Sequence, residues 1–411
     1  MTTAPLQVTV RAIAAGGDGV ATLPDGRTVF ISRAAPGDRV VLRNVRLHAR
    51  FARAEIAEVM EPGSDRVMPP CVHYIADRCG GCQLMHLSPE AQRAVKGRIV
   101  GDAFRRIARL DIADPEVMPA PADFGYRAKV TFTLRSGRIM GYHQVHDAWS
   151  VFDVHECLIA DDEVRALHAA LRSARRYLPR DNARVVLRID RTHVPHVLVL
   201  SEPGDAWTGA QPLHLALQAR GVNAVVWWRP GGGQPRVVAG ADTPWPVTVF
   251  EQVHPAMGAI VRGAALDALG AVAGLEVWDL YAGIGESTVA LAARGATVDS
   301  VESDTRAVSV AESLGPPGPR RHAGLVEDLA GRLPKPQLVL ANPPRTGMAP
   351  RATDAVALSA AGRVAYVSCD PATLARDVAR MGSAYRLAGL RAFDQFPQTA
   401  HVECLAVLER R

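Results

Sequence analysis

Short runs of alternating apolar and polar residues fill the first part of the chain, from about residue 5 to residue 60. Three turn-forming segments interrupt them: Gly16-Gly-Asp-Gly19, Pro24-Asp-Gly26 and Pro36-Gly-Asp38. A period of two residues places alternate side chains on opposite faces of a strand, and glycine next to proline or aspartate favours the turns between strands. The pattern predicts a small antiparallel β-barrel in residues 1–61.

The middle of the chain, residues 62–246, predicts one helix followed by further strands. Ser88 and Pro89 suit the N-cap and the first position of a basic helix that runs to about Leu110. Beyond Phe124 the pattern returns to strands and loops, and the clearest strands are residues 126–134 and 184–189. We therefore expect a β-rich central domain.

After Val247 the chain repeats strand, glycine-rich turn and helix. This alternation predicts a doubly wound parallel sheet, so residues 247–411 form an α/β domain in our interpretation. Four strands are expected, at residues 276–281, 296–301, 337–341 and 363–368.

Composition narrows the class of protein. Residues of the hydrophobic class make up 48% of the 411 residues, and neither a long apolar span nor a basic start followed by an apolar run is present. We expect a cytoplasmic globular protein without membrane contact. The net charge of +5 favours polyanionic partners only weakly, because arginine supplies nearly all of it. Its distribution says more: through Arg53 there are eight arginines against three aspartates, which favours nucleic-acid contact over a solvated barrel face.

A glycine-rich loop stands where the first strand of the α/β domain ends. It reads Asp279-Leu-Tyr281-Ala-Gly283-Ile-Gly285, and Glu302 ends the next strand, where an acidic side chain would bind ribose hydroxyls. A dinucleotide-binding fold is the rival interpretation. The missing third glycine and the acidic start at Asp279 favour S-adenosylmethionine.

The segment Asn342-Pro-Pro-Arg345 follows the third strand and leaves two kinds of methyltransferase open. Asn-Pro-Pro followed by an aromatic residue is the hallmark of enzymes that methylate exocyclic amino groups. Arg345 replaces that aromatic residue here, and the amine interpretation does not account for Cys369 and Glu403.

Those two residues suggest methylation of carbon. Carbon 5 of uracil is a poor nucleophile, but addition of a thiolate to carbon 6 produces an enolate that accepts a methyl group, and a carboxylate then removes the proton from carbon 5. Cys369, in Ser368-Cys-Asp370-Pro, would be the nucleophile, and Glu403 the base. An isolated cysteine is more often a buried small hydrophobe, but this one follows a strand at the edge that faces the ligand crevice. We expect Cys404 to be a core residue of the last strand.

Four further cysteines suggest a metal centre. Cys71, Cys79 and Cys82 lie close in sequence, and Cys157 completes a set of four thiolates. Four thiolates suit either zinc or an iron–sulfur cluster, and spacing alone slightly favours zinc, with His73 as a spare ligand.

Taken in order, these motifs resemble the RNA uracil-5 methyltransferase family over essentially the whole chain. The similarity includes a TRAM-like barrel, the Cys-Gly-Gly-Cys group, the cofactor loop, the Asp-Pro-Pro-Arg-like segment, Ser-Cys-Asp-Pro for the family's Ser-Cys-Asn-Pro, and the ending Phe396-Pro-Gln-Thr-Ala-His-Val-Glu403.

The resemblance implies roles for individual residues. Cys369 matches the family's nucleophile and Glu403 its proton acceptor, while the contacts to S-adenosylmethionine correspond to Gln252, Tyr281, Glu302 and Asn342. It also implies a four-iron, four-sulfur cluster on Cys71, Cys79, Cys82 and Cys157 rather than zinc. This chain departs from the family at Asn342 (usually aspartate), His254 (usually asparagine) and Asp370 (usually asparagine), and its gap between Cys71 and Cys79 is longer.

We therefore expect an S-adenosylmethionine-dependent RNA uridine-5 methyltransferase, acting as a monomer. A TRAM-like barrel resembles the rRNA-modifying branch, so rRNA of the large subunit is the first expected substrate and tRNA the second. The alternative from another class is an RNA-binding or assembly protein that has kept the fold and lost turnover, which the Asn342 and Asp370 departures favour and the retention of Cys369 and Glu403 opposes.

Overall fold

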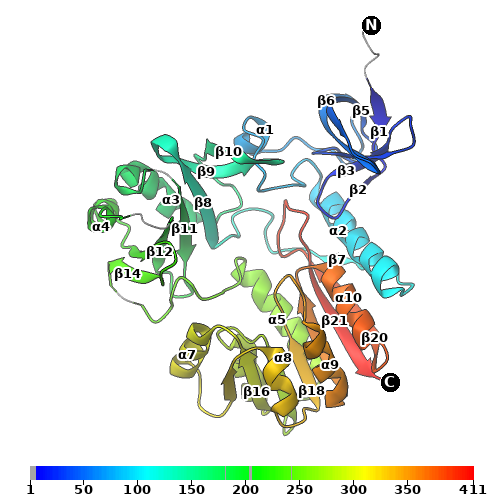
Figure 1. Cartoon of the computed structure of the whole chain (residues 1–411), viewed down its shortest axis with the longest axis vertical. Helices are drawn as coiled ribbons and strands as arrows, with labels where there is room; N and C mark the ends of the chain where they lie inside the picture. The colour runs from blue at the N-terminus through cyan, green and yellow to red at the C-terminus, as the bar shows by residue number, and fades with distance from the viewer. Residues whose placement is uncertain (1–5, 181, 203–205, 242) are drawn as a thin grey trace. The chain divides into compact units, whose positions relative to one another are not determined.

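The computed structural model describes residues 6–180, 182–202, 206–241 and 243–411. These residues form a mixed α/β protein with three sheets (Figure 1). They group into two compact units, one holding residues up to 95, 122–241 and 396–400, the other residues 96–121, 243–395 and 401–411. The three-way division at residues 61 and 246 stays a prediction. No helix within the described ranges is long and apolar enough to cross a membrane.

The first unit contains a six-stranded N-terminal sheet, as the alternating pattern predicts for strands. In sheet order its strands are β1 (Gln7–Thr9), β5 (Arg39–Leu47), β6 (Phe51–Glu61), β4 (Thr28–Ile31), β3 (Gly19–Thr22) and β2 (Ala12–Ile13). Apolar side chains such as Val29, Ile31 and Ala52 are fully buried in one cluster between the strands. The exposed positions of β5 and β6 include Arg43, Arg46 and Arg53 as well as Glu58 and Glu61.

The same unit contains a seven-stranded central sheet. Its order is β10 (Asp147–Asp153), β9 (Ile139–Gln144), β8 (Lys129–Arg135), β11 (Ala183–Ile189), β12 (Pro195–Ser201), β13 (Val225–Arg229) and β14 (Arg236–Ala239). Helices α3 (Asp162–Ala174) and α4 (Ala210–Gln218) pack against one face, where Phe132, Leu187 and Val199 join their apolar residues in one core. The expected strands at 126–134 and 184–189 are found within a few residues of these bounds.

Helix α2 (Pro89–Ala103) begins where the sequence indicates. The hydroxyl of Ser88 accepts a hydrogen bond from the backbone N–H of Ala91 at 3.3 Å, as an N-cap does. The last turn, Phe104–Ala108, is a π-helical turn closed by Arg109 in the left-handed region (φ 58°), so the helix ends just before the expected Leu110.

The second unit contains an eight-stranded sheet, here called the catalytic sheet because the residues expected to be catalytic, Cys369 and Glu403, lie on or next to its strands. Its order is β17 (Arg320–Ala323), β16 (Thr297–Glu302), β15 (Glu276–Leu280), β18 (Leu338–Ala341), β19 (Arg363–Ser368), β21 (Glu403–Arg410), β20 (Tyr385–Phe393) and β7 (Val117–Met118). The first five strands are parallel, and β21 runs antiparallel to both of its neighbours. The four expected strands are confirmed to within one residue, whereas the pattern missed β17, β20 and β7.

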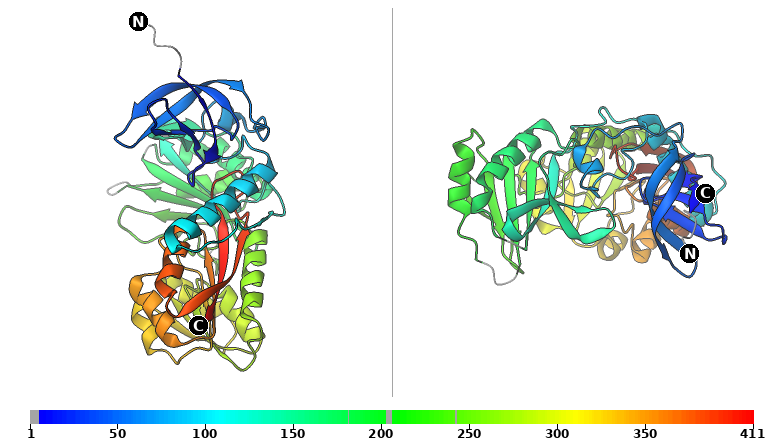
Figure 2. Two further views of the ribbon diagram at one scale, coloured as in Figure 1. Left: turned by 90° about the vertical axis from the view of Figure 1, so that its right-hand side faces the viewer. Right: turned by 90° about the horizontal axis from the view of Figure 1, so that it is seen from above.

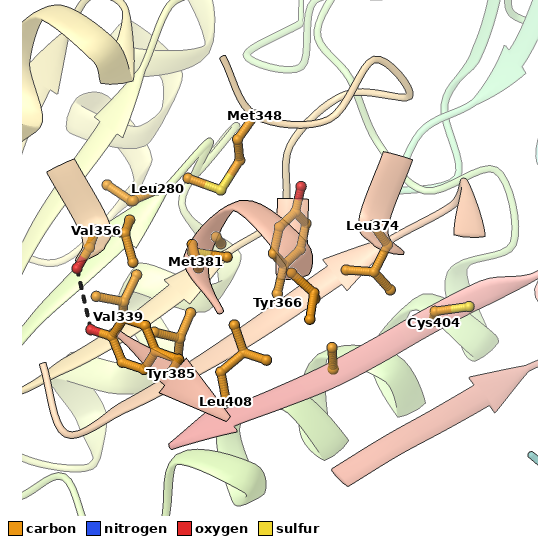
Figure 3. Close-up of a cluster of buried hydrophobic side chains, with 14 of the residues drawn as sticks. Leu280, Val339, Met348, Val356, Tyr366, Leu374, Met381, Tyr385, Cys404 and Leu408 are labelled. Carbon is orange, nitrogen blue, oxygen red and sulfur yellow. Dashed lines mark hydrogen bonds between the residues drawn. The ribbon is translucent and has the colours of Figure 1, made fainter. Parts of the chain in front are cut away.

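Helices cover both faces of the catalytic sheet. They are α5 (Pro255–Leu269), α6 (Glu286–Ala293), α7 (Thr305–Leu314), α8 (Val326–Leu329), α9 (Pro350–Ser359) and α10 (Pro371–Met381). In the left view of Figure 2, α5 (yellow-green) and the orange helices α9 and α10 lie on opposite sides of the strands. Figure 3 shows the core beneath α9 and α10, where Tyr366 and Cys404 are fully buried, as expected for Cys404. This packing holds the sheet edge that carries the site.

Candidate active site

Three residues proposed as cofactor contacts stand side by side at the carboxyl edge of the catalytic sheet. The strand register brings Tyr281, Glu302 and Asn342 to neighbouring positions, because the residues just before them are paired across β15, β16 and β18. The chain leaves β15 for β16 on one side, and β18 lies on the other side. Such a point of reversal is where open α/β sheets bind ligands.

The glycine-rich loop after β15 is anchored from below by Asp279. Its buried carboxylate accepts hydrogen bonds from the hydroxyls of Ser287 (2.7 Å) and Thr288 (2.6 Å) in α6. Burial raises the pKa of Asp279 to about 6. The acidic start of the loop motif therefore ties the loop to the following helix.

Backbone geometry explains the glycines of the loop. Gly283 and Gly285 have φ of 57° and 81°, in the left-handed region that glycine adopts without strain. A Cβ atom on Gly283 would meet no atom within 4 Å, whereas one on Gly285 would stand 3.4 Å from Ala311 in α7. The loop thus has open space beside Gly283, whereas Gly285 allows the loop to pack closely against α7.

Glu302 faces the loop in a fixed orientation. One carboxylate oxygen accepts the backbone N–H of Gly283 at 2.9 Å, and the other accepts the N–H of Asp304 at 2.7 Å. The open space, the glycine backbone and an oriented carboxylate are what an adenosyl cofactor with ribose hydroxyls requires. The residues present fit S-adenosylmethionine.

Gln252 lies just before α5 and is held from two sides. Its side-chain oxygen accepts a hydrogen bond from Gln395 at 3.2 Å, and Gly258 leaves room for its side chain, since a Cβ there would come within 2.8 Å. His254 is the N-cap of α5, and its Nδ1 accepts the N–H of Met257. Burial lowers the pKa of His254 to about 4, which keeps Nδ1 unprotonated. The histidine thereby does what an asparagine would do at an N-cap.

Cys369 directly follows β19, and Glu403 is the first residue of the adjacent strand β21. Ser368, at the end of β19, pairs with Cys404 of β21, so the next step of this antiparallel register sets Cys369 opposite Glu403. The negative charge of Glu403 acts on the Cys369 thiol, so the two side chains lie close together. Cys369 is partly exposed, whereas Glu403 is only 4% exposed.

The electrostatics of this pair keep both groups neutral in the free protein. Burial raises the pKa of Glu403 to about 8. Burial, and then the Glu403 carboxylate, raise the pKa of Cys369 to about 11, while Arg345 acts in the opposite direction. Arg345 also hydrogen-bonds the Nδ1 of His401 at 2.9 Å. The protonation of the proposed nucleophile therefore depends on the charge of the proposed base beside it.

The loop that carries Arg345 is fixed by a buried aspartate. Asp377 in α10 accepts hydrogen bonds from the hydroxyl of Tyr366 (2.7 Å) and from the N–H of Met348 (2.8 Å). Arg376 donates to the carbonyl of Thr346 in the same loop at 2.8 Å. The sequence analysis missed this support, because nothing in the motif marks Asp377 as buried.

The structure explains how Asp370, another departure from the family pattern, is accommodated. Asp370 is the N-cap of α10, and its carboxylate accepts the N–H groups of Ala372 (3.0 Å) and Thr373 (2.9 Å). An asparagine could cap the helix in the same way without a charge. The charge matters because the Asp370 carboxylate also raises the pKa of Cys369.

An Asp370→Asn protein is therefore expected to keep its fold and to ionise Cys369 at lower pH than the original protein does. The pH dependence of iodoacetamide alkylation, followed by mass spectrometry on the Cys369 peptide, measures this. Asp370→Ala serves as the control that also removes the cap, at a cost of about 1 kcal/mol in stability. An unchanged alkylation profile for Asp370→Asn would show that the charge does not reach the thiol.

A buried ion pair fixes the chain at the end of β20, ahead of the proposed catalytic base Glu403. Lys96, in α2, is fully buried and donates to Asp394, which directly follows β20 and is 2% exposed. Asp394 precedes Gln395, the partner of Gln252. Removing one partner of such a pair leaves an uncompensated buried charge, so the pair fixes this part of the chain.

The segment between β20 and β21 belongs to the first unit over residues 396–400. Gln398 exchanges hydrogen bonds with Gln92, at 2.9 Å and 3.0 Å, and the hydroxyl of Tyr126 donates to the carbonyl of Pro397 at 2.9 Å. Gln398, the glutamine of the Phe-Pro-Gln-Thr motif, therefore fixes residues 396–400 to Gln92 of α2.

The structure brings the four cysteines of the proposed metal centre together in the first unit. Cys71 and Cys157 pack against Cys82 in one small cluster. Burial raises the pKa of Cys82 well above its ordinary value, and the neighbouring thiols Cys157, Cys79 and Cys71 raise it further. Part of the long gap after Cys71 forms a short helix, α1 (Val72–Ile75).

Hydrogen bonds surround these thiols. The sulfur of Cys79 accepts the N–H of Gly81 at 3.4 Å, and that of Cys157 accepts the hydroxyl of Tyr142 at 3.9 Å. Arg33, in the turn after β4, donates to the carbonyls of Tyr74 and Cys79 and so holds the cysteine loop. Donors of this kind stabilise metal-bound thiolates.

The structure offers little support for a site that binds a single zinc ion. Within the described ranges, no three histidine, cysteine, aspartate or glutamate side chains form a group that could hold one metal ion. His73 is not a spare ligand, since its Nδ1 contacts Asp77 at 2.7 Å and its Nε2 accepts the N–H of His155 at 2.9 Å.

Comparisons with known proteins point to one family, by a family model over the C-terminal residues and by relatives over nearly the whole chain. The family described as tRNA (Uracil-5-)-methyltransferase matches residues 332–411, which include Asn342, Cys369 and Glu403. An uncharacterised RNA methyltransferase of Gloeobacter violaceus is 33% identical over 98% of this chain and 96% of its own length. The 23S rRNA (uracil(1939)-C(5))-methyltransferase of Acidithiobacillus ferrooxidans is 30% identical over 99% of this chain and 98% of its own.

A solved structure has the same fold. The tRNA (uracil-54, C5)-methyltransferase of Pyrococcus abyssi, in complex with S-adenosyl-L-homocysteine, matches 98% of this chain and 99% of its own, with a TM-score of 0.75 and 22% identity. At 22% identity this match shows only that the fold is the same. The family follows from the two relatives that are at least 30% identical over nearly the whole chain. The chain belongs to the RNA uracil-5 methyltransferase family, and its enzymatic activity is S-adenosylmethionine-dependent methylation of RNA.

Proposed function

We propose that this enzyme methylates carbon 5 of a uridine in 23S rRNA through a covalent bond between Cys369 and the base. The observation that carries the proposal is the position of Cys369 opposite Glu403 at the edge of the sheet that bears the cofactor loop. An addition–elimination sequence needs a nucleophile and a base that reach the two adjacent carbons of one ring.

The reaction divides between these two side chains. The Cys369 thiolate forms a bond to carbon 6, and the electron pair of the carbon 5–carbon 6 double bond moves to the enolate. Gln252, Tyr281, Gly283, Gly285, Glu302 and Asn342 would hold S-adenosylmethionine, which would supply the methyl group to carbon 5 and would leave as S-adenosylhomocysteine. The Glu403 carboxylate takes the proton of carbon 5, the double bond re-forms, and the bond from carbon 6 to sulfur breaks to release the thiolate.

Arg345 suits a role in the first step. Its positive charge lowers the pKa of Cys369, against the effects of burial and of Glu403. The uridine must leave its stack to reach the thiol, at a cost of a few kcal/mol that is smallest in a loop. Arg345 is exposed beside the thiol, so it can contact the base or its backbone on arrival.

Large-subunit rRNA is the preferred substrate because of the arginine-rich N-terminal sheet and the named relative. The Acidithiobacillus relative is described as acting on uracil 1939 of 23S rRNA. The Pyrococcus structure, whose title names a tRNA substrate, favours tRNA as the second candidate.

For the four cysteines we propose a four-iron, four-sulfur cluster on Cys71, Cys79, Cys82 and Cys157. The gathering of four thiols, the donors to two of the sulfurs and the occupied nitrogens of His73 support it. The methylation above moves no net electrons, so such a cluster serves structure or RNA positioning.

Mass spectrometry of nucleosides from a deletion strain tests the substrate. We expect 5-methyluridine to disappear from 23S rRNA and to remain in tRNA, and the gene carrying wild-type Cys369 to restore it. Loss from tRNA alone would transfer the assignment to tRNA, and unchanged 5-methyluridine in both RNAs would contradict the proposed function.

The proposed role of Asn342 predicts a charge effect on cofactor affinity. Asn342→Asp places a carboxylate at an exposed position beside the proposed sulfonium site, so S-adenosylmethionine should bind roughly two- to fivefold more tightly. S-Adenosylhomocysteine lacks the sulfonium charge and is the matched control, with unchanged affinity expected. Calorimetric titration measures both, and equal effects on the two ligands would refute a direct charge contact.

A further inference from the structure

The most exposed aromatic side chain of the described residues has no role in the reaction above. Trp149 lies in β10, close to the turn that joins it to β9, and is 86% exposed. Single exposed aliphatic residues are common on protein surfaces, but tryptophan carries a large apolar ring whose exposure to water is costly.

The backbone at Trp149 lies in an irregular part of the β9–β10 ladder and is bonded to the Asp147 side chain. The Asp147 carboxylate accepts the N–H groups of Trp149 (2.9 Å) and Ser150 (3.1 Å), together with the Ser150 hydroxyl (2.6 Å). The β9–β10 hairpin is also bonded to the cysteine loop, since Gly80 donates to the carbonyl of His143 at 3.0 Å. The ring is therefore displayed on a fixed support, which reduces the entropy that a bound partner would cost.

Basic groups stand close to this hairpin within the same unit. Asp18 accepts from His146, in the β9–β10 turn, at 3.1 Å through one oxygen, and from Arg53 of β6 at 3.1 Å through the other. Asp18 thus joins the turn near Trp149 to the arginine hairpin, which consists of β5, β6 and the turn between them. Figure 1 shows both hairpins in the first unit.

The turn end of the arginine hairpin, residues 43–53, carries four arginines, an aromatic component and no acidic residue, whereas Glu55, Glu58 and Glu61 lie further along β6. Arg43, Arg46, Arg50 and Arg53 are all exposed, and Arg46 and Arg50 have no ion pair among the described residues. At its turn the ring of His48 stacks on Phe51, with centroids 4.4 Å apart. Arginines bind phosphates and aromatic faces stack on bases, and their combination is typical of surfaces for unpaired RNA.

We propose that Trp149 stacks on an unpaired base of the RNA substrate while the arginine hairpin binds the adjoining backbone. The inference rests on the proposed function for its RNA partner, and it assigns to the first unit the recognition of single-stranded structure. An unpaired base offers a π-face of any sequence, so this contact selects loops over helices.

Binding assays with variants of the full-length protein test the proposal. The probes are a short single-stranded RNA of mixed sequence and a duplex of the same length. We expect Trp149→Ala to bind the single strand roughly 5- to 100-fold more weakly and the duplex unchanged, and Trp149→Phe to restore most of the affinity. Leu358→Ala, which truncates a 78% exposed side chain on α9, is the control and should bind as the original protein does.

Salt dependence separates stacking from charge. Trp149→Ala should keep the slope of log affinity against log salt, whereas Arg50→Ala should reduce it by about one phosphate contact.

Two results for Trp149→Ala would overturn the proposal: affinity for the single strand within about twofold of wild type, or an equal loss of affinity for duplex RNA. Trp149 would then bind a partner of another class. Trp149→Ala at saturating RNA should still transfer methyl groups. If the wild-type protein methylates RNA and Trp149→Ala binds normally, only this inference fails; if the wild-type protein neither binds nor methylates RNA, the proposed function fails as well.

Discussion

A Cys369→Ala protein is expected to lose methyl transfer to RNA while it keeps its fold and its affinity for S-adenosylmethionine. Cys369 follows β19 and is partly exposed at the sheet edge, so alanine leaves no cavity in the core. Without a thiolate, carbon 6 forms no covalent bond and carbon 5 stays too weak a nucleophile to be methylated. Transfer of labelled methyl groups to rRNA transcripts measures the loss.

Cys404→Ala is the matched control for this substitution. Cys404 is the next cysteine in space, but it is fully buried and packs in the core shown in Figure 3. Its removal should lower stability and leave methyl transfer per folded molecule unchanged. Methylation by Cys369→Ala at a rate close to that of Cys404→Ala would exclude the thiol as the nucleophile.

A Glu403→Gln protein is expected to stop after methylation, with the RNA still bound to Cys369. The amide fits the same buried space, but it cannot take the proton of carbon 5, so turnover should fall by roughly 10²- to 10⁴-fold. Denaturing gels and mass spectrometry should reveal a covalent complex between protein and ordinary uridine RNA. Glu409→Gln, at the other end of β21, is the control and should turn over normally. Slow turnover without any covalent complex would instead indicate that Glu403 acts before the Cys369 thiolate adds to carbon 6.

The pKa of Glu403 predicts how activity and stability depend on pH. Only the carboxylate form can accept a proton, so the rate should rise as pH increases through about 8. The folded protein holds this proton more tightly than the unfolded chain does, so the contribution of Glu403 to stability is full below about pH 4.5 and is lost as pH rises through about 8. Glu403→Gln should therefore be more stable than the original protein in alkaline solution. Melting temperatures between pH 5 and 9 measure the difference.

Much of the catalytic domain could be predicted from sequence because its signals are local. Buried strands followed by glycine turns marked β15, β16, β18 and β19, and a strand end is where a nucleophile is expected. The same locality identified Ser88-Pro89 as a helix start. These features depend on neighbours within a few residues.

The remaining features depend on partners far apart in the chain. The insertion of β21 between β19 and β20 sets Cys369 against Glu403, and no pattern of hydrophobic residues specifies that order. Lys96 reads as one cation of a basic helix, yet it is fully buried against Asp394. The sequence showed His254 and Asp370 only as departures from the family pattern, whereas in the structure each of them caps a helix, as an asparagine can. Only the three-dimensional contacts separate these cases.

The most direct test of the account uses RNA that contains 5-fluorouridine. Fluorine at carbon 5 cannot leave as a proton, so the base Glu403 cannot complete the reaction and the covalent intermediate should persist. Wild-type protein, S-adenosylmethionine and fluorinated rRNA fragments are combined, digested and analysed by mass spectrometry. We predict a methylated fluorouridine adduct on the Cys369 peptide, present in Cys404→Ala and absent from Cys369→Ala. The absence of any adduct with rRNA and tRNA fragments, or an adduct on another cysteine, would contradict covalent catalysis by Cys369.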